Sequence, residues 1–83
     1  MIGKKEKVHR INVSSLDFPQ LVAGAGQIKV PAGKYERGDT LLLLEYDSKK
    51  LKPTGKTIER WVYKVLRQEE KTMYLVLLIN RTK

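Results

Sequence analysis

The chain has 83 residues, of which 41% are hydrophobic and 31% charged, with a formal net charge of +8. A chain this short holds one compact core, since only about 60% of its unfolded surface is buried on folding, so we predict a single domain over residues 1–83 with basic flexible ends at about 1–7 and 81–83. With no cysteine and one histidine, the sequence offers no thiolate or histidine cluster for a metal, and we expect neither a metal nor a cofactor.

The first half of the chain predicts a strand, a short helix and a second short strand. Alternating residues over 8–13 are typical of a strand. Residues 18–22 have helical apolar spacing, and Pro19 is tolerated only in a first turn, so the helix must be short. Gly24 is suited to end it, and residues 27–30 then give a brief β-like run.

The second half predicts three further strands. Residues 40–47 are almost continuously apolar, as in a strand covered on both faces, and 47–55 read as an exposed connection with proline and glycine as breakers. Residues 57–67 fit a strand or an amphipathic helix, and their β-branched and aromatic content favours the strand. Residues 72–79 give a last apolar strand. We therefore expect an α+β, mostly β fold, namely a small closed barrel with one short helix after the first strand.

A series of short motifs, in this order, resembles small bacterial and phage proteins of the ASCH-like branch of the PUA-like superfamily. The resemblance covers about residues 9–79 and depends on the order of the motifs: His9-x-Ile11, Phe18-x-x-Leu21-x-x-Gly24, Arg37-Gly38-Asp39, Leu41-x-Leu43-x-Glu45-Tyr46-Asp47 and Thr54-Gly55-Lys56. It implies a small β-barrel with a helix after the first strand. It also implies a function on RNA or nucleosides, because several relatives are believed to bind RNA and some hydrolyse acetylated cytidine with a lysine and a glutamate in the cleft.

The stretch after the expected helix departs from the family pattern. Residues 24–31 lack the expected lysine, and Lys29 and Pro31 stand where a glutamate and an arginine are usual. This departure favours a binding module over an enzyme. The alternative is a small amidohydrolase acting on a modified nucleoside, with Lys29 and Glu45 as its catalytic residues.

Arg37-Gly38-Asp39 spells a cell-adhesion tripeptide, a use that requires an extracellular setting. The cysteine-free sequence fits a reducing compartment, no apolar stretch follows the basic N-terminus as in a signal peptide, and no apolar run approaches the roughly 20 residues of a membrane-spanning helix. We expect a cytoplasmic protein without membrane contact. In the tripeptide we expect Gly38 to adopt a positive φ and Asp39 to accept backbone hydrogen bonds at a turn.

The distribution of charge indicates nucleic acid as a partner. Residues 1–10 and 81–83 together carry five of the eight net charges, and the loop lysines Lys49, Lys50, Lys52 and Lys56 carry four, so the rest of the chain is almost neutral. Solvated lysines that keep the protein soluble explain this equally well. Basic and aromatic residues also lie close together in two segments, 34–37 and 60–64, as in sheets that hold phosphates and stack bases. The predicted nucleic-acid contacts are Lys29, Lys34, Tyr35, Arg37, Lys49, Lys50, Lys52, Arg60 and Trp61.

Two further expectations concern single features. Glu45 interrupts an apolar strand, which predicts an ion pair with Lys29 or Arg60, or a general base in a cleft. Residues 75–79 could form an exposed edge strand that pairs with a partner or with a second copy, which would make the chain a protein-interaction module with weak self-association.

Overall fold

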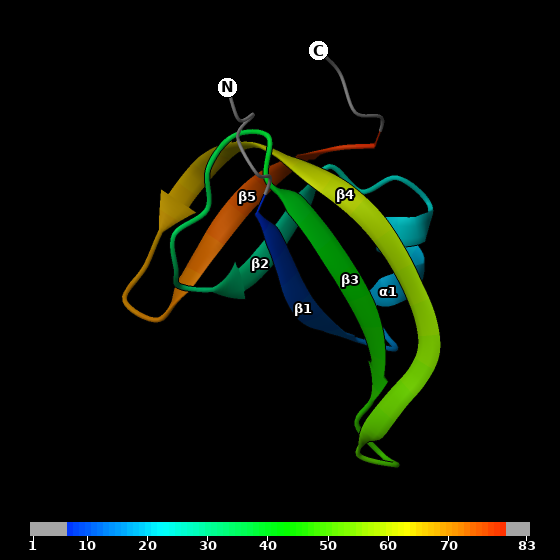
Figure 1. The fold of residues 1–83 in the computed structure, drawn as a ribbon. Helices are drawn as coiled ribbons and strands as arrows, with labels where there is room; N and C mark the ends of the chain where they lie inside the picture. Colours follow the sequence, from blue (N-terminus) through cyan, green and yellow to red (C-terminus); the bar gives the residue numbers. More distant parts are fainter. Residues whose placement is uncertain (1–6, 80–83) are drawn as a thin grey trace.

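The computed structural model describes residues 7–79, which form a five-stranded sheet and one short helix (Figure 1). The predicted basic ends lie outside these residues, except for Lys7. The elements follow in the order β1 (Val8–Ser14), α1 (Phe18–Val22), β2 (Gln27–Pro31), β3 (Thr40–Asp47), β4 (Lys52–Gln68) and β5 (Thr72–Leu78). The mostly β fold with a short helix after the first strand is confirmed, as is the choice of a strand over a helix for 57–67.

The sheet is open, so the predicted closure into a barrel is wrong. Its strand order is β1-β3-β4-β5-β2, with β1 parallel to β3 and every other pair antiparallel. Among residues 7–79 the two outer strands β1 and β2 therefore each have one edge without a neighbouring strand. β5, which contains most of the segment 75–79 that could have formed an exposed edge strand, lies between β4 and β2 instead. The edges available for pairing with another chain are those of β1 and β2.

β4 is the long, curved strand that connects the two halves of the sheet (Figure 1). Its first part, from Lys52 to Trp61, pairs with β3, and its second part, from Trp61 to Gln68, pairs with β5. Register shifts interrupt both pairings, and such bulges bend a strand. The expected connection over 47–55 is consequently shorter than predicted, because β4 already begins at Lys52 and accommodates its proline and glycine next to a bulge.

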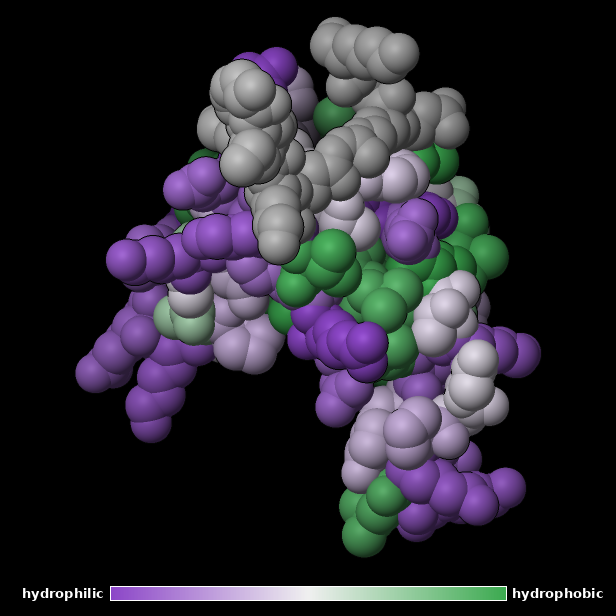
Figure 2. All heavy atoms as spheres, viewed as in Figure 1, coloured by the Kyte–Doolittle hydropathy of each residue, from purple (hydrophilic) through white to green (hydrophobic). Residues whose placement is uncertain are grey.

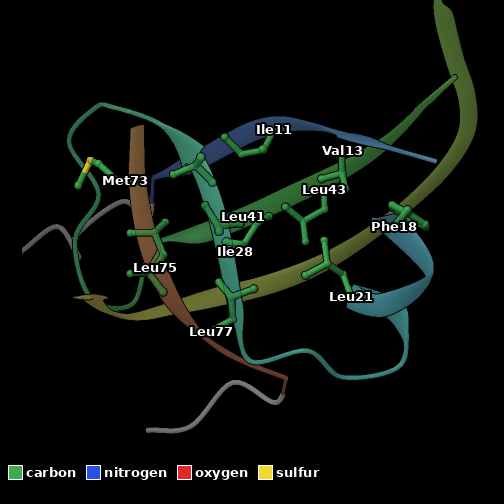
Figure 3. Packing of buried hydrophobic residues seen from close by; sticks show 12 residues of the cluster. Ile11, Val13, Phe18, Leu21, Ile28, Leu41, Leu43, Met73, Leu75 and Leu77 are labelled. Carbon is green, nitrogen blue, oxygen red and sulfur yellow. The ribbon is translucent and has the colours of Figure 1, made fainter. Parts of the chain in front are cut away.

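The core lies inside the curved sheet, with α1 against one end (Figure 3). Its buried side chains come from all five strands and from the helix: Ile11, Val13, Phe18, Leu21, Ile28, Val30, Leu41, Leu43, Val62, Met73, Leu75 and Leu77. From Leu41 onward only alternate residues of β3 are buried, while Leu42 and Leu44 are half-buried. The expectation that this strand is fully covered on both faces was therefore too strong.

Arg60 connects β4 to the helix. It pairs with the buried Leu41 across the β3–β4 ladder, and its Nη2 donates a hydrogen bond to the carbonyl oxygen of Leu21 at 2.9 Å. Nη1 donates to the carbonyl of Glu59 at 2.7 Å. The Leu21 carbonyl also accepts the Gly24 N–H at 3.1 Å, so the guanidinium is the second donor to this carbonyl at the end of α1.

The described residues contain no helix with the length and apolar character required to cross a membrane.

Candidate functional site

A cavity of about 260 Å³ lies between the end of β1, the helix α1 and the start of β2. Its position follows from the topology, because β1 and β2 are the two edges of the open sheet. The buried apolar residues Val13, Leu21 and Ile28 contribute to its wall. The polar lining comes from six other residues: Asn12, Ser14, Asp17, Gln20, Gln27 and Lys29.

Three of these lining residues carry side-chain amides. The side chains of Asn12, Gln20 and Gln27 are amides, each with an NH₂ donor and a carbonyl acceptor. Such amides match the adjacent donors and acceptors on the edge of a nucleobase. The cavity is smaller than the roughly 300–1,000 Å³ of pockets for drug-sized ligands, so it suits a planar ring rather than a large molecule.

A row of three side chains continues from the cavity across the sheet. Lys29 on β2 and Arg67 on β4 both pair with Tyr74 on β5, from opposite sides. The Lys29 Nζ lies 6.0 Å from the centre of the Tyr74 ring, and the Arg67 Cζ lies 4.3 Å from it. These cation–π contacts hold two positive charges in a line that begins at the cavity.

Sequence reasoning selected Lys29 but missed Tyr74 and Arg67. Their pairing depends on a register shift between Val65 and Arg67 in the β4–β5 ladder, and no sequence pattern predicts such a shift. Arg67 also forms an ion pair with Glu69, with 3.2 Å between Nη2 and Oε2. Both side chains are largely exposed, so this pair stabilises the fold little.

The loop between β2 and β3 holds three of the predicted contacts, Lys34, Tyr35 and Arg37, and is mostly engaged in packing. The Tyr35 ring lies 4.6 Å from the ring of His9, and its hydroxyl donates to the Pro31 carbonyl at 2.9 Å. Burial raises the pKa of Tyr35. Arg37 stacks over Tyr63 of β4, with 4.8 Å to the ring centre, while Lys34 is exposed.

The turn before β3 has the conformation expected from its residues. Gly38 has a φ of 93°, and its N–H donates to the carbonyl of Val62 at 2.8 Å. The buried carboxylate of Asp39 accepts the Glu36 backbone N–H at 3.0 Å and lies 2.8 Å from His9 Nε2. This carboxylate therefore links the loop before β3 to His9 near the start of β1.

Asp39 titrates below the usual range of a carboxyl. Burial opposes its ionisation, but the hydrogen bonds from His9 and the Glu36 N–H and the charges of His9 and Lys7 outweigh it and lower the pKa of Asp39. A carboxyl with a lowered pKa in the folded state stabilises the fold above its unfolded pKa, and this contribution is lost as the pH falls through the folded pKa.

We therefore expect Asp39→Ala to lower the free energy of unfolding by about 2 kcal/mol at pH 7. The difference from the wild type should stay constant down to about pH 5 and shrink below about pH 4, because the carboxyl of the unfolded chain takes up its proton there while the folded one, with its lowered pKa, does so only at more acidic pH. Urea unfolding of both proteins at several pH values measures this. A difference that does not depend on pH would show that the charge of Asp39 is unimportant.

The structure separates the predicted basic residues rather than joining them. Lys49, Lys50 and Lys52 lie in the β3–β4 hairpin at one end of β3, and the loop with Lys34 and Arg37 lies at the other end (Figure 1). An eight-residue strand spans about 26 Å. Trp61 is half-buried in the middle of β4, and Arg60 is bound to α1. Lys29 alone of the predicted set lines the cavity.

Glu45 has neither of its expected partners. Its Oε1 accepts a hydrogen bond from the Thr54 hydroxyl at 2.6 Å, and the carboxylate is buried. The bond lies beside the β3–β4 register shift, so Glu45 fixes the base of the hairpin. Glu45 does not line the cavity that Lys29 lines, so the two residues do not share a site. Within residues 7–79, no three His, Asp or Glu side chains gather as a donor set for a metal ion.

Comparison with known proteins gives one finding about the family. Residues 8–79, nearly the whole chain, match the model of a family described as a domain of unknown function (DUF3850). No curated protein matches the chain.

Proposed function

The chain belongs to the DUF3850 family of domains of unknown function, and on this premise we propose that it is a non-enzymatic module that binds single-stranded nucleic acid, RNA in particular. The observation that carries the proposal is the cavity between β1 and β2, with its amide-bearing rim and the adjoining cations of Lys29 and Arg67. One base enters the cavity, and the neighbouring phosphates lie along the row on the sheet.

The amides supply the contacts to the base. Single-stranded bases are recognised by hydrogen bonds to edges that a duplex would occupy, and three amides offer donors and acceptors in several directions. The apolar wall contributed by Val13, Leu21 and Ile28 suits the face of a ring. An amide that also contacts the 2′-hydroxyl distinguishes RNA from DNA.

Phosphate contacts follow from the positions of the two cations. Lys29 lines the cavity and Arg67 lies two strands away, so a chain leaving the cavity meets them in succession. Their ion pairs with phosphate are charge-assisted, and the arginine can bind two oxygens at once. Lys34 and Arg37 in the loop before β3 provide further positive charge for a longer strand.

We also propose that the family is placed in the ASCH-like branch of the PUA-like superfamily. The helix directly after the first strand and the cavity beside it support this placement. Lys29 in place of a glutamate, and the absence of the buried Glu45 from the cavity that Lys29 lines, argue against the amidohydrolase of that branch. Weak self-association stays a prediction, and the free edges of β1 and β2 are the strands that could carry it.

A fluorescence titration with a labelled RNA octamer tests the function. Each phosphate contact to a single strand contributes about −0.7 to the slope of log K against log salt. Two contacts give a slope of about −1.4, so the affinity should fall about sevenfold between about 50 and 200 mM salt. Absence of binding at the lower salt concentration would refute the proposal.

A further inference from the structure

The tip of the β3–β4 hairpin extends from the body of the domain (Figure 1). We call residues 46–53 the arm. Tyr46 pairs with Pro53 and Asp47 with Lys52, and the Asp47 carboxylate accepts the N–H groups of the next turn, at 2.9 Å from Lys49 and 3.2 Å from Lys50. Residues 48–53 are all exposed. The arm is thus an ordered ribbon that contributes nothing to the core.

Leu51 at the end of the arm is unfavourable for the isolated domain in two ways. Its side chain is 74% exposed, and its φ of 56° lies in the left-handed region, where glycine and asparagine are favoured over branched side chains. Asparagine or glycine would relieve the backbone and avoid the exposed apolar surface. A leucine that costs stability in both ways indicates a contact with a partner.

The surroundings of Leu51 select the chemistry of this partner. Lys49, Lys50 and Lys52 flank it and are exposed, and the Asp47 carboxylate faces the backbone of the turn. Figure 2 shows the same arrangement, with a hydrophobic side chain among hydrophilic ones at the end of the hairpin. The partner therefore presents anions on both sides of a narrow apolar surface.

We propose that the arm enters the major groove of double-helical DNA, where its lysines contact the phosphates at the rims and Leu51 contacts thymine methyl groups at the floor. The major groove is about 12 Å wide and 8.5 Å deep and admits a two-stranded ribbon. Three residues from Tyr46 to the turn reach about 10 Å, which is enough to reach the bases. The thymine methyl is the apolar group exposed there.

The composition of the arm favours DNA over a lipid surface. A bilayer interface takes up an apolar face made of several side chains, and Leu51 is the one large aliphatic residue between positions 47 and 57. A single leucine is sufficient for a methyl group in a groove. The register shift at the base of the arm, beside the Glu45–Thr54 hydrogen bond, sets its direction relative to the sheet.

Leu51→Asn tests the contact, because folding and binding should respond in opposite directions. The variant should unfold at a temperature higher by about 3 °C, since asparagine adopts the left-handed region more readily. On a thymine-rich DNA duplex the wild type should bind about fourfold more tightly than on the same duplex with uracil in place of thymine, which lacks the methyl. The variant should bind both duplexes equally, and with lower affinity than the wild type.

A second variant tests the lysines and separates this site from the single-strand site. K49Q/K50Q should reduce the salt slope for duplex DNA by about 1.8 and leave the affinity for the RNA octamer unchanged. Equal wild-type affinity for the thymine and uracil duplexes, or an unchanged affinity of Leu51→Asn, would overturn the proposal. So would binding to phosphatidylserine vesicles that requires Leu51 while the duplexes show no such requirement. Loss of octamer binding alone would count against the proposed function and not against the arm.

Discussion

Replacing Lys29 and Arg67 together by glutamine should weaken binding of the RNA octamer by about a hundredfold at about 50 mM salt. In the proposed complex each residue supplies one charge-assisted contact to a phosphate, and such a contact contributes about 1.5 kcal/mol or more, or roughly a factor of ten. Glutamine keeps most of the length and polarity of both side chains. The loss therefore reports charge, and the salt slope should fall by about 1.4 at the same time.

A change at Glu69 should have the opposite effect on the affinity for the RNA octamer. Its carboxylate occupies Arg67 at 3.2 Å and would compete with a phosphate for the same guanidinium. Glu69→Gln should accordingly raise the affinity for the octamer by about threefold, because an exposed ion pair is worth at most about 1 kcal/mol. Titration of the three proteins side by side measures both effects.

K49Q/K50Q serves as the matched control, since it removes the same charge from a different part of the surface. If binding depends only on net charge, both double variants will lose affinity equally. An equal loss would refute the site at Lys29 and Arg67. A loss confined to K29Q/R67Q, together with a gain in Glu69→Gln, would locate the bound strand on the row beside the cavity.

The elements were largely predictable from sequence because their signals are local. Alternation, helical spacing and turn residues placed the strands and the helix, and Gly38 and Asp39 adopt the conformation and the hydrogen bond that their residue types favour. The exception is the hairpin, where Pro53 and Gly55 suggested a loop. Both lie in β4 because a bulge accommodates them.

The candidate site was less predictable because it depends on pairs of residues far apart in the chain. The polar lining of the cavity comes from β1, α1 and β2, and the row joins Lys29, Arg67 and Tyr74 through strand register. Arg60, by contrast, was predicted as a nucleic-acid contact but does not belong to the candidate site. An arginine beside a tryptophan suggests a binding surface, but the ladder turns it toward α1. Faces of a bulged strand cannot be assigned by counting residues.

The open sheet also makes the site dependent on a single ladder. β2 forms one wall of the cavity and, within the part of the chain that the structure describes, pairs with β5 alone. Within that ladder the fully buried Leu75 lies opposite Ile28, a cavity-lining residue of β2. Packing of Leu75 thus stabilises the core and the cavity wall together.

Leu75→Ala should therefore have the largest effect on stability. Leucine-to-alanine changes in a packed core cost about 2–5 kcal/mol, since they lose apolar burial and leave a cavity. A loss of about 3 kcal/mol would lower the unfolding temperature of a domain this small by about 15 °C. Urea and thermal unfolding measure it, with Leu66→Ala as the control, because Leu66 lies on β4 with 48% of its surface exposed and should lose less than about 1 kcal/mol.

Octamer binding by the same variant, measured well below its unfolding temperature, connects the core to the site. Leu75 does not line the cavity, so any loss of affinity must come through the position of β2. We expect a severalfold weaker affinity with an unchanged salt slope, since Lys29 and Arg67 keep their charges while the cavity wall shifts. A reduced slope would instead mean that Lys29 or Arg67 no longer contacts a phosphate, because the number of phosphate contacts alone sets that slope.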